Sequence, residues 1–244
     1  MREEYAQFLL EKTREDYNKI ANHFSRTRSY IPKDILYLKK FIQKSEKILD
    51  LGCGNGRLFE IKNDAEYFGA DVSSKMIEIA KKSYPQGKFF LTSPLSLPFQ
   101  DHFFDKVFCL SVFHHTPSFK YRMKILKEIK RVLKKDGILI LTVWNLLPKK
   151  KVKWLLLKYT IFKLIGKSNL DFFDIFLPWK DSQGNIIIER YLHVFTLNSL
   201  KNTVQKAGFK VLEERILERS KKESNLFIAA SPRLAGLRPC SSIG

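Results

Sequence analysis

Three glycines alternate with other residues at the end of a short apolar run, in the segment 48–56 (ILDLGCGNG). The apolar run predicts a buried strand, and Gly52, Gly54 and Gly56 predict a sharp turn directly after it. A ligand can lie against such a backbone, because glycine has no Cβ that would occupy the ligand's volume. The segment is therefore the first candidate binding site in the chain.

The spacing of the glycines and two acidic residues indicate which ligand this turn fits. In the pattern G-x-G-x-G the third glycine follows the second after one residue. Dinucleotide-binding loops have two residues between these glycines (G-x-G-x-x-G). Asp50 stands two residues before the first glycine, where its charge would repel a pyrophosphate. Asp71 closes the next predicted strand about twenty residues later, where a carboxylate can accept hydrogen bonds from two ribose hydroxyls. These features favour a ligand with a ribose and without a pyrophosphate.

Two segments resemble the first two motifs of class I S-adenosylmethionine-dependent methyltransferases: DLGCGNG and GADVSSKMIEIAKK. The resemblance implies that the three glycines line the methionine and ribose portion of S-adenosylmethionine. It also implies that Asp50 orients the amino-acid end, that Asp71 holds the ribose diol, and that Val72 and Met76 flank the adenine. The implied cofactor-binding set is completed by Tyr17, Asn55, Ser93, Pro94, Leu95 and Leu110.

The third motif departs from the family pattern. Leu97-Pro98-Phe99 is intact, but Ser93-Pro94 stands where relatives carry an acidic residue that accepts from the adenine amino group. A neutral hydroxyl is a weaker acceptor than a carboxylate. We therefore expect backbone groups of Pro94 and Leu95 to take over part of adenine recognition, and we expect a modest cofactor affinity.

Paired histidines, His114 and His115, follow the strand predicted over 105–112, at the position where such folds bind ligands. Adjacent side chains point in different directions and no carboxylate stands beside them, so a metal site is not expected. The three cysteines, Cys53, Cys109 and Cys240, form no metal-binding spacing either. Each histidine either faces the cofactor or the substrate, or serves in packing or capping.

A more specific resemblance covers about residues 15 to 215. YNKIANHFSRTR, the HH pair, DIFLPW and RYLHVFTLNSLKNTVQKAGF are similar to the tRNA methyltransferases that esterify 5-carboxymethyluridine at the wobble position. The resemblance implies the tRNA anticodon loop as substrate and, as a partner, the small zinc-binding activator protein of the eukaryotic enzymes. The long polar insert of some relatives is replaced here by a basic, leucine-rich stretch after Pro148.

A carboxylate acceptor needs no general base, because a carboxylic acid with a pKa of about 4 is already ionised at neutral pH. Catalysis is then mostly the placement of one oxygen in line with the methyl group. Arg190, His193 and Tyr191 are candidates for orienting the carboxylate, with Arg26 and Arg28 as helpers. Because strand residues alternate, Arg190 and His193 converge only if the strand bends.

The charge of the whole chain points to polyanionic partners. Forty-four Lys and Arg against 25 Asp and Glu give a net charge of +19. The stretch 149–167 carries seven lysines and no acid, interleaved with apolar residues. If helical, this stretch could lie along RNA phosphates, on an anionic membrane surface, or over the active site as a lid. Membrane contact is the less favoured of these partners, and tRNA the more favoured.

The elements that position these residues alternate between strands and helices. Apolar runs predict strands at 47–51, 66–70, 88–92, 105–112, 137–144, 209–217 and 225–230, with helices at 3–24, 32–43, 73–83, 118–134 and 197–207. This rhythm is typical of a parallel sheet covered on both faces. We expect an α/β Rossmann-like class I methyltransferase domain (1–231) with a seven-stranded, mostly parallel sheet and a helical cap (1–44). An insert (about 145–195) precedes the last helix–strand pair, and 232–244 is expected to be a disordered tail.

The sequence carries no predicted targeting or membrane-spanning segment. The first 16 residues are charged throughout, and no apolar run reaches the ~18 residues needed to span a bilayer. Together with the few cysteines, this favours a cytoplasmic enzyme. We expect a tRNA wobble-uridine methyltransferase, with a small-molecule O-, N- or C-methyltransferase as the alternative. A third hypothesis is a catalytically silent cofactor-binding subunit that binds RNA.

Overall fold

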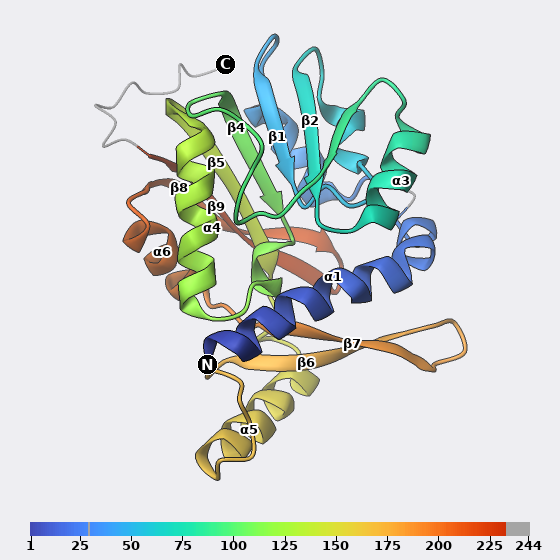
Figure 1. The fold of residues 1–244 in the computed structure, drawn as a ribbon, viewed down its shortest axis with the longest axis vertical. Helices are drawn as coiled ribbons and strands as arrows, with labels where there is room; N and C mark the ends of the chain where they lie inside the picture. Colours follow the sequence, from blue (N-terminus) through green and yellow to red (C-terminus); the bar gives the residue numbers. More distant parts are fainter. Residues whose placement is uncertain (29, 233–244) are drawn as a thin grey trace.

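The computed structural model describes residues 1–28 and 30–232, which fold as a β-sheet between layers of helices (Figure 1). Within these residues, seven strands form the main sheet in the order β3-β2-β1-β4-β5-β9-β8. Strands β1 to β5 run parallel, whereas β9 is antiparallel to both of its neighbours. The expected fold is confirmed. The strands are β1 (Lys47–Leu51), β2 (Glu66–Asp71), β3 (Lys88–Leu91), β4 (Phe104–Leu110), β5 (Leu133–Trp144), β8 (Lys210–Ser220) and β9 (Glu223–Ser231).

Apolar side chains on both faces of the central strands hold the layers together. Leu49 of β1 packs in the cluster that α4 and α6 cover, whereas its neighbour Ile48 packs in the cluster that α2 and α3 cover. This alternation explains why the strands read as continuous apolar runs. The helices are α1 (Glu3–Arg26), α2 (Lys33–Leu38), α3 (Ser74–Ser83), α4 (Phe119–Val132), α5 (Lys150–Leu164) and α6 (Leu197–Lys206), with short 3₁₀ helices at Lys39–Phe41, Arg57–Ile61 and Phe113–His115.

The insert between β5 and α6 lies outside the main sheet. It contains α5 and a two-stranded antiparallel hairpin, β6 (Asp174–Lys180) and β7 (Ile186–His193). One side of α5 packs on the hairpin through Val152 and Leu155, which are buried with Ile175 and Leu192. Figure 1 shows the hairpin beside α1 and α5 at the outer end of the molecule.

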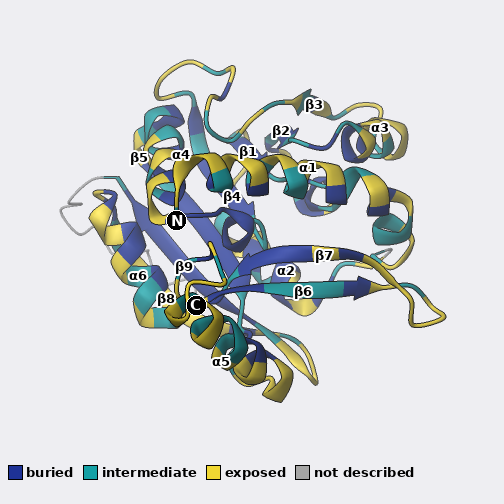
Figure 2. Cartoon of the chain, turned by 60° about the horizontal axis from the view of Figure 1, so that its bottom comes forward, coloured by how far each residue is buried: buried dark blue, intermediate teal, exposed yellow. Residues whose placement is uncertain are grey.

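The N-terminal helix α1 is longer than expected and crosses the strand ends of the sheet (Figures 1 and 2). It is anchored to the first turn of α3, because the Asn18 side chain accepts a hydrogen bond of 2.7 Å from the Ser73 hydroxyl. Among the described residues, no helix is both long and apolar enough to cross a bilayer. The expected tail lies outside the described residues from position 233 onward.

Candidate active site

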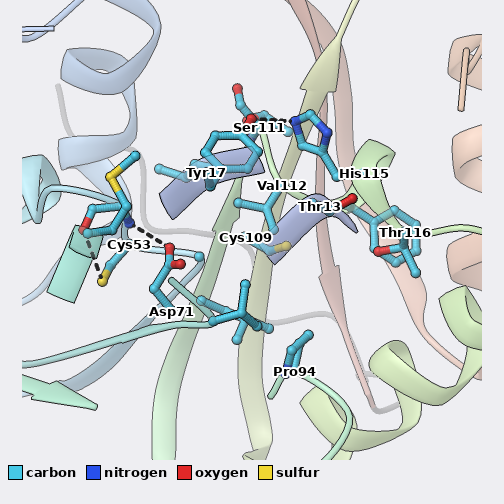
Figure 3. A pocket seen from close by; sticks show the side chains of 18 of the residues that line it. Thr13, Tyr17, Cys53, Asp71, Pro94, Cys109, Ser111, Val112, His115 and Thr116 are labelled. Atoms are coloured by element: carbon cyan, nitrogen blue, oxygen red, sulfur yellow. Dashed lines mark hydrogen bonds between the residues drawn. The ribbon is translucent and has the colours of Figure 1, made fainter. Parts of the chain in front are cut away.

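A cavity of about 1100 Å³ lies at the carboxyl ends of β1, β2, β4 and β5 (Figure 3). Residues of α1 and of the β6–β7 hairpin complete its wall. The position follows from the topology, because the strand order reverses between β1 and β4, and the connections on the two sides leave in opposite directions. Helices therefore diverge at this point and leave a crevice.

The three glycines of the predicted loop are required for different reasons. All have left-handed backbones, with φ values of 77° at Gly52, 55° at Gly54 and 81° at Gly56. A Cβ on Gly52 would lie 2.3 Å from a Val112 methyl, and one on Gly56 would lie 3.0 Å from the Phe89 ring. At Gly54 the nearest atom would be 3.6 Å away, so that its missing side chain leaves room in the cavity. Gly52 and Gly54 line the cavity, whereas Gly56 is not among its lining residues.

Asp71 is held rigidly at the end of β2 by the glycine loop. One of its oxygens accepts from the Gly54 N–H at 2.9 Å, and the other accepts from the Ser73 N–H at 2.8 Å. Burial raises the pKa of this carboxyl, while these backbone N–H groups oppose the rise. Each carboxylate oxygen can accept a further hydrogen bond. The two oxygens can therefore accept hydrogen bonds from two adjacent hydroxyls of a ribose.

Asp50 is buried at the end of β1 and accepts a hydrogen bond of 2.8 Å from the Tyr67 hydroxyl. Burial raises the pKa of Asp50 to about 7, and the nearby Asp71 carboxylate also raises it. A cationic group beside Asp50 would favour its ionised form. The carboxyl is therefore suited to the ammonium end of an amino acid.

The remaining predicted cofactor residues also lie at the cavity. Ser93 uses its hydroxyl oxygen to accept from the Leu95 N–H at 3.2 Å, so this backbone group is already engaged within the loop. The predicted residues that line the cavity here are Tyr17, Asn55, Val72, Met76, Ser93, Pro94, Leu95 and Leu110.

His115 lines the cavity beside Tyr17 (Figure 3), and both of its ring nitrogens are engaged. Its Nδ1 lies 3.1 Å from the Tyr191 carbonyl, which can only accept, so Nδ1 carries the proton. Its Nε2 therefore accepts from the Tyr17 hydroxyl at 2.8 Å. Burial lowers the pKa of His115 to about 3, and the Arg190 charge contributes. The ring is neutral at physiological pH and positions Tyr17.

His114 has a different environment from its neighbour. It is buried and packs against the Trp144 ring at a centroid distance of 4.6 Å, and neither ring nitrogen has a hydrogen-bond partner in the part of the chain that the structure describes. Burial lowers the pKa of His114 well below its usual value. It is not among the cavity-lining residues. Its contacts are those of a packing residue.

Arg190 extends from β7 into the cavity between two indole rings. Its guanidinium carbon lies 5.0 Å from the Trp144 ring centroid and 4.7 Å from that of Trp179. Its Nε has no hydrogen-bond partner, and it forms no ion pair with a carboxylate of the described residues. Burial lowers the pKa of Arg190, whereas the Tyr17 hydroxyl raises it. The side chain is a preorganised cation that lacks an anionic partner.

His193, on the other face of β7, does not reach the cavity. Its Nδ1 lies 2.7 Å from an Asp174 oxygen, and its ring packs on Phe195. Arg190 and His193 therefore lie on opposite faces of β7, as the alternation of side chains along a strand predicted. Tyr191 is buried in the cluster between β7 and α1, on the same side as His193 rather than at the cavity.

The predicted helper arginines divide into one at the cavity and one outside it. Arg28 lines the cavity, with its guanidinium carbon 4.2 Å from the Phe24 ring centroid and 4.9 Å from that of Trp179. Burial, together with the smaller effect of neighbouring arginines, lowers the pKa of Arg28 to about 10. Arg26 is exposed at the end of α1 and does not line the cavity.

Sequence reasoning assigned no role to several cavity residues, among them both tryptophans. Trp179 belongs to the DIFLPW segment, whose last residue is fixed by a 3.0 Å hydrogen bond from its Nε1 to His23. The DIFLPW motif itself was the available signal for Trp179. The further lining residues include Cys53, Arg57, Cys109, Ser111, Asn145, Arg219 and Asn225.

Comparison with known proteins assigns this fold to methyl transfer. Residues 49–141 match the model of a methyltransferase domain. The chain is 28% identical to a tRNA (carboxymethyluridine(34)-5-O)-methyltransferase of Schizosaccharomyces pombe, with 81% of this chain and 88% of the relative covered. It is 30% identical to an Encephalitozoon cuniculi protein named as a candidate methyltransferase, with 87% and 90% covered. An Arabidopsis thaliana tRNA (carboxymethyluridine(34)-5-O)-methyltransferase is 32% identical, but the chain spans only 31% of it.

Solved structures share the fold at lower identity. A S-adenosylmethionine-dependent methyltransferase of Methanosarcina mazei has a TM-score of 0.67 at 22% identity, with 80% of this chain and 96% of the other covered. A methyltransferase from a Haloferax volcanii complex with the Trm112 activator has a TM-score of 0.61 at 15% identity, with 91% and 98% covered.

Proposed function

This chain belongs to the class I S-adenosylmethionine-dependent methyltransferases, and we propose that its methyl acceptor is the carboxymethyl side chain of a wobble uridine in tRNA. Arg190 carries the proposal: it is a cation fixed between Trp144 and Trp179, it faces the cavity, and no carboxylate of the described residues pairs with it. An arginine fork fits a planar carboxylate. The names of the Schizosaccharomyces pombe and Arabidopsis thaliana relatives support this acceptor.

The residues at the glycine loop fit S-adenosylmethionine. Gly54 leaves open space where a side chain would stand, and the free lone pairs of Asp71 suit the ribose diol. Asp50 suits the ammonium group of the methionine portion, and Met76, which lines the cavity, suits an apolar contact with the adenine. When bound, S-adenosylmethionine supplies an electrophilic methyl group on a sulfonium sulfur.

The residues around the acceptor orient it rather than deprotonate it. A carboxylate with a pKa of about 4 is already ionised at neutral pH. Arg190 therefore has to hold the anion, and the two indoles prevent its guanidinium from moving away. His115 is unsuited to proton removal, because burial lowers its pKa to about 3 and its Nε2 already accepts from Tyr17. Holding the carboxylate in the correct orientation accelerates the reaction without a group that gains or loses a proton.

The arginines of the cavity match a substrate with more than one anionic group. Arg219 pairs with Asp34 at 3.4 Å and with Glu223 at 3.8 Å. Arg28, Arg57 and Arg190 form no such ion pair within the described part of the chain. One of them can hold the carboxylate, and the others remain for phosphates of the RNA backbone. The net charge of +19 adds a long-range attraction for tRNA.

A small zinc-binding activator protein is the further partner that we infer. The resemblance of the motifs to the eukaryotic wobble-uridine enzymes supports it, as does the fold shared with the Haloferax volcanii methyltransferase of the Trm112 complex. Co-expression with the activator of the source organism, followed by affinity purification, tests the pairing. Recovery of the enzyme alone, together with full activity in its absence, would exclude a required activator.

Nucleoside analysis tests the proposed acceptor directly. Purified enzyme and isotope-labelled S-adenosylmethionine are incubated with tRNA from cells that lack the gene, once alone and once with the activator. We expect the label in the methyl ester of 5-carboxymethyluridine, identified by mass spectrometry after digestion. The matched control is tRNA from cells that carry the gene, in which we expect the methyl ester to be present already and no free carboxylate to remain as acceptor. Label in another nucleoside, or only in small metabolites of a cell extract, would disprove this acceptor.

A further inference from the structure

Helix α5 exposes an apolar stripe on the side that faces away from the hairpin. Trp154, Leu157 and Leu164 are 59%, 60% and 72% exposed. Together with Ile161 they follow spacings of three and four residues, which place them along one face of a helix. Ile165 and Phe162 extend the stripe, and both are exposed. Exposed apolar surface of this extent marks an interaction site.

Lysines border this stripe on both sides. At 3.6 residues per turn, Lys151 and Lys158 lie along one edge, Lys153 lies along the other, and Lys150 lies at its N-terminal end. The Nζ of Lys158 stands 5.6 Å from the Trp154 ring centroid and 5.5 Å from that of Phe162, so its stem runs over the aromatic surface. The sequence from 145 to 170 contains no Asp or Glu.

We propose that this face of α5 binds the surface of a lipid bilayer with anionic headgroups. An apolar stripe bordered by lysines is the arrangement of helices that lie in a membrane interface, where the stripe enters the acyl boundary and the lysines meet the headgroups. The helix has 15 residues and lies along the surface, since no described helix is suited to crossing a bilayer.

Three other occupants fit the observations less well. The phosphates of RNA would neutralise the lysines. They would not provide an apolar environment for Leu157, Ile161 and Leu164, which would remain in contact with water or charged groups. A second copy of this chain would bring a second row of lysines against the first, without an acid to separate them. A lid over the active site is excluded by position, because no residue of α5 lines the cavity. Anionic lipid satisfies both the charge and the apolar surface.

The test is co-sedimentation of the full chain with vesicles of phosphatidylcholine alone and of phosphatidylcholine with phosphatidylserine. We expect binding only to the anionic vesicles, with a strong dependence on salt. Leu157→Glu combined with Ile161→Glu should lower the partition coefficient by about a hundredfold or more, because two side chains lose their apolar transfer. The matched control is Leu212→Glu with Ile216→Glu, since these exposed residues lie on β8, away from the insert.

Tryptophan fluorescence provides a second measurement on the same samples. Trp154 is exposed, so its emission should shift to the blue when anionic vesicles are added, and Trp154→Phe should remove this shift while vesicles still bind. Replacement of Lys150, Lys151, Lys153 and Lys158 by Gln should abolish the preference for anionic vesicles.

Several outcomes would overturn the proposal. One is equal binding, or none, with both kinds of vesicle. Another is an equal loss of vesicle binding in the β8 control. A third is a wild-type chain that ignores vesicles, while the four lysine substitutions weaken its affinity for tRNA, which would make α5 an RNA-binding element. A fourth is self-association that the paired glutamates abolish without any vesicle binding, which would make it a contact between copies.

Discussion

Arg28 and Arg190 lie over the same indole ring, that of Trp179, with guanidinium carbons 4.9 and 4.7 Å from its centroid. One arginine belongs to the N-terminal helix region and the other to the hairpin of the insert, and Trp179 holds both at the cavity. Two cations at one ring repel each other, and this lowers the pKa of Arg28 in addition to the effect of burial. An anionic substrate relieves the repulsion.

Substitution of Arg190 should separate substrate placement from cofactor binding. We expect Arg190→Ala to lower kcat/KM for tRNA by roughly a hundredfold, as the loss of an orienting contact does. Affinity for S-adenosylhomocysteine, measured by calorimetry, should not change. Lys at this position should restore only part of the activity, since a point charge cannot bind a carboxylate with two prongs. Full activity of the alanine variant would remove Arg190 from the reactive site.

Trp179→Leu tests whether the shared ring positions the arginines. The substitution removes two cation–π contacts, each worth about 0.5–2 kcal/mol, and keeps an apolar side chain. We expect a lower kcat with acceptor tRNA, with the affinity for S-adenosylhomocysteine maintained. Trp154→Leu, on the exposed face of α5, is the matched control. A similar loss in both variants would indicate that Trp179 serves the fold rather than the arginines.

Asp71→Ala should weaken cofactor binding. The lost charge-assisted hydrogen bonds are worth about 1.5–3 kcal/mol, or roughly 10- to 150-fold in Kd. Calorimetry with S-adenosylhomocysteine measures this, and Asp64→Ala, at an exposed acid that pairs with Lys44 at 3.6 Å, is the control. An unchanged Kd would place the ribose elsewhere.

Valine at two glycines of the loop should affect stability to different degrees. In Gly54→Val the side chain projects into the cavity, so cofactor binding should be lost while the thermal transition persists with a modest decrease in Tm. In Gly52→Val the new Cβ would stand 2.3 Å from Val112, so the protein should lose much of its stability as well. Calorimetric binding and thermal unfolding distinguish the two. Retained binding in the Gly54 variant would contradict the assigned cofactor position.

The pH dependence should appear in cofactor affinity and not in the chemical step. Asp50 has a pKa raised to about 7 without ligand, and a cationic group of the cofactor favours its ionised form. The affinity for S-adenosylmethionine should therefore fall as the pH drops below about 7, by at most tenfold per unit, and level off above it. The turnover number at saturating cofactor should stay flat between about pH 6 and 9. A turnover that rises tenfold per pH unit near neutrality would require a general base and a hydroxyl or amine acceptor.

Local patterns were sufficient to predict the sheet and most of the residues that line the cavity at the glycine loop. The alternation of apolar runs with helices predicts a mostly parallel sheet. The glycine loop and Asp71 lie within the segment from β1 to the end of β2, so their contacts involve near neighbours in sequence. The orientation of Arg190 relative to His193 also followed from strand alternation. These features depend on spacing alone.

The tryptophan pair and the insert depend on contacts between distant segments. Trp179 meets His23 and Arg28 from the first helix region and Arg190 from the next strand, and no local pattern specifies that these segments meet. Likewise, the sequence of α5 left RNA, membrane and lid open, because the choice depends on which face packs on the hairpin. Gly56 was grouped with its two neighbours although its side of the loop meets Phe89 rather than the cavity.

The cavity is closed by both ends of the described chain: Tyr17 in α1 and Asn225 in β9 line the same space, and the Asn225 amide donates to Asp34 at 2.6 Å across 191 positions. During synthesis the glycine loop emerges early, but its binding site is incomplete until the last strand has been added to the sheet. Ligand affinity is therefore a late-acquired property of the nascent polypeptide. A bound cofactor then stabilises the two ends together, and hydrogen exchange should slow in α1 and β9 to a similar degree.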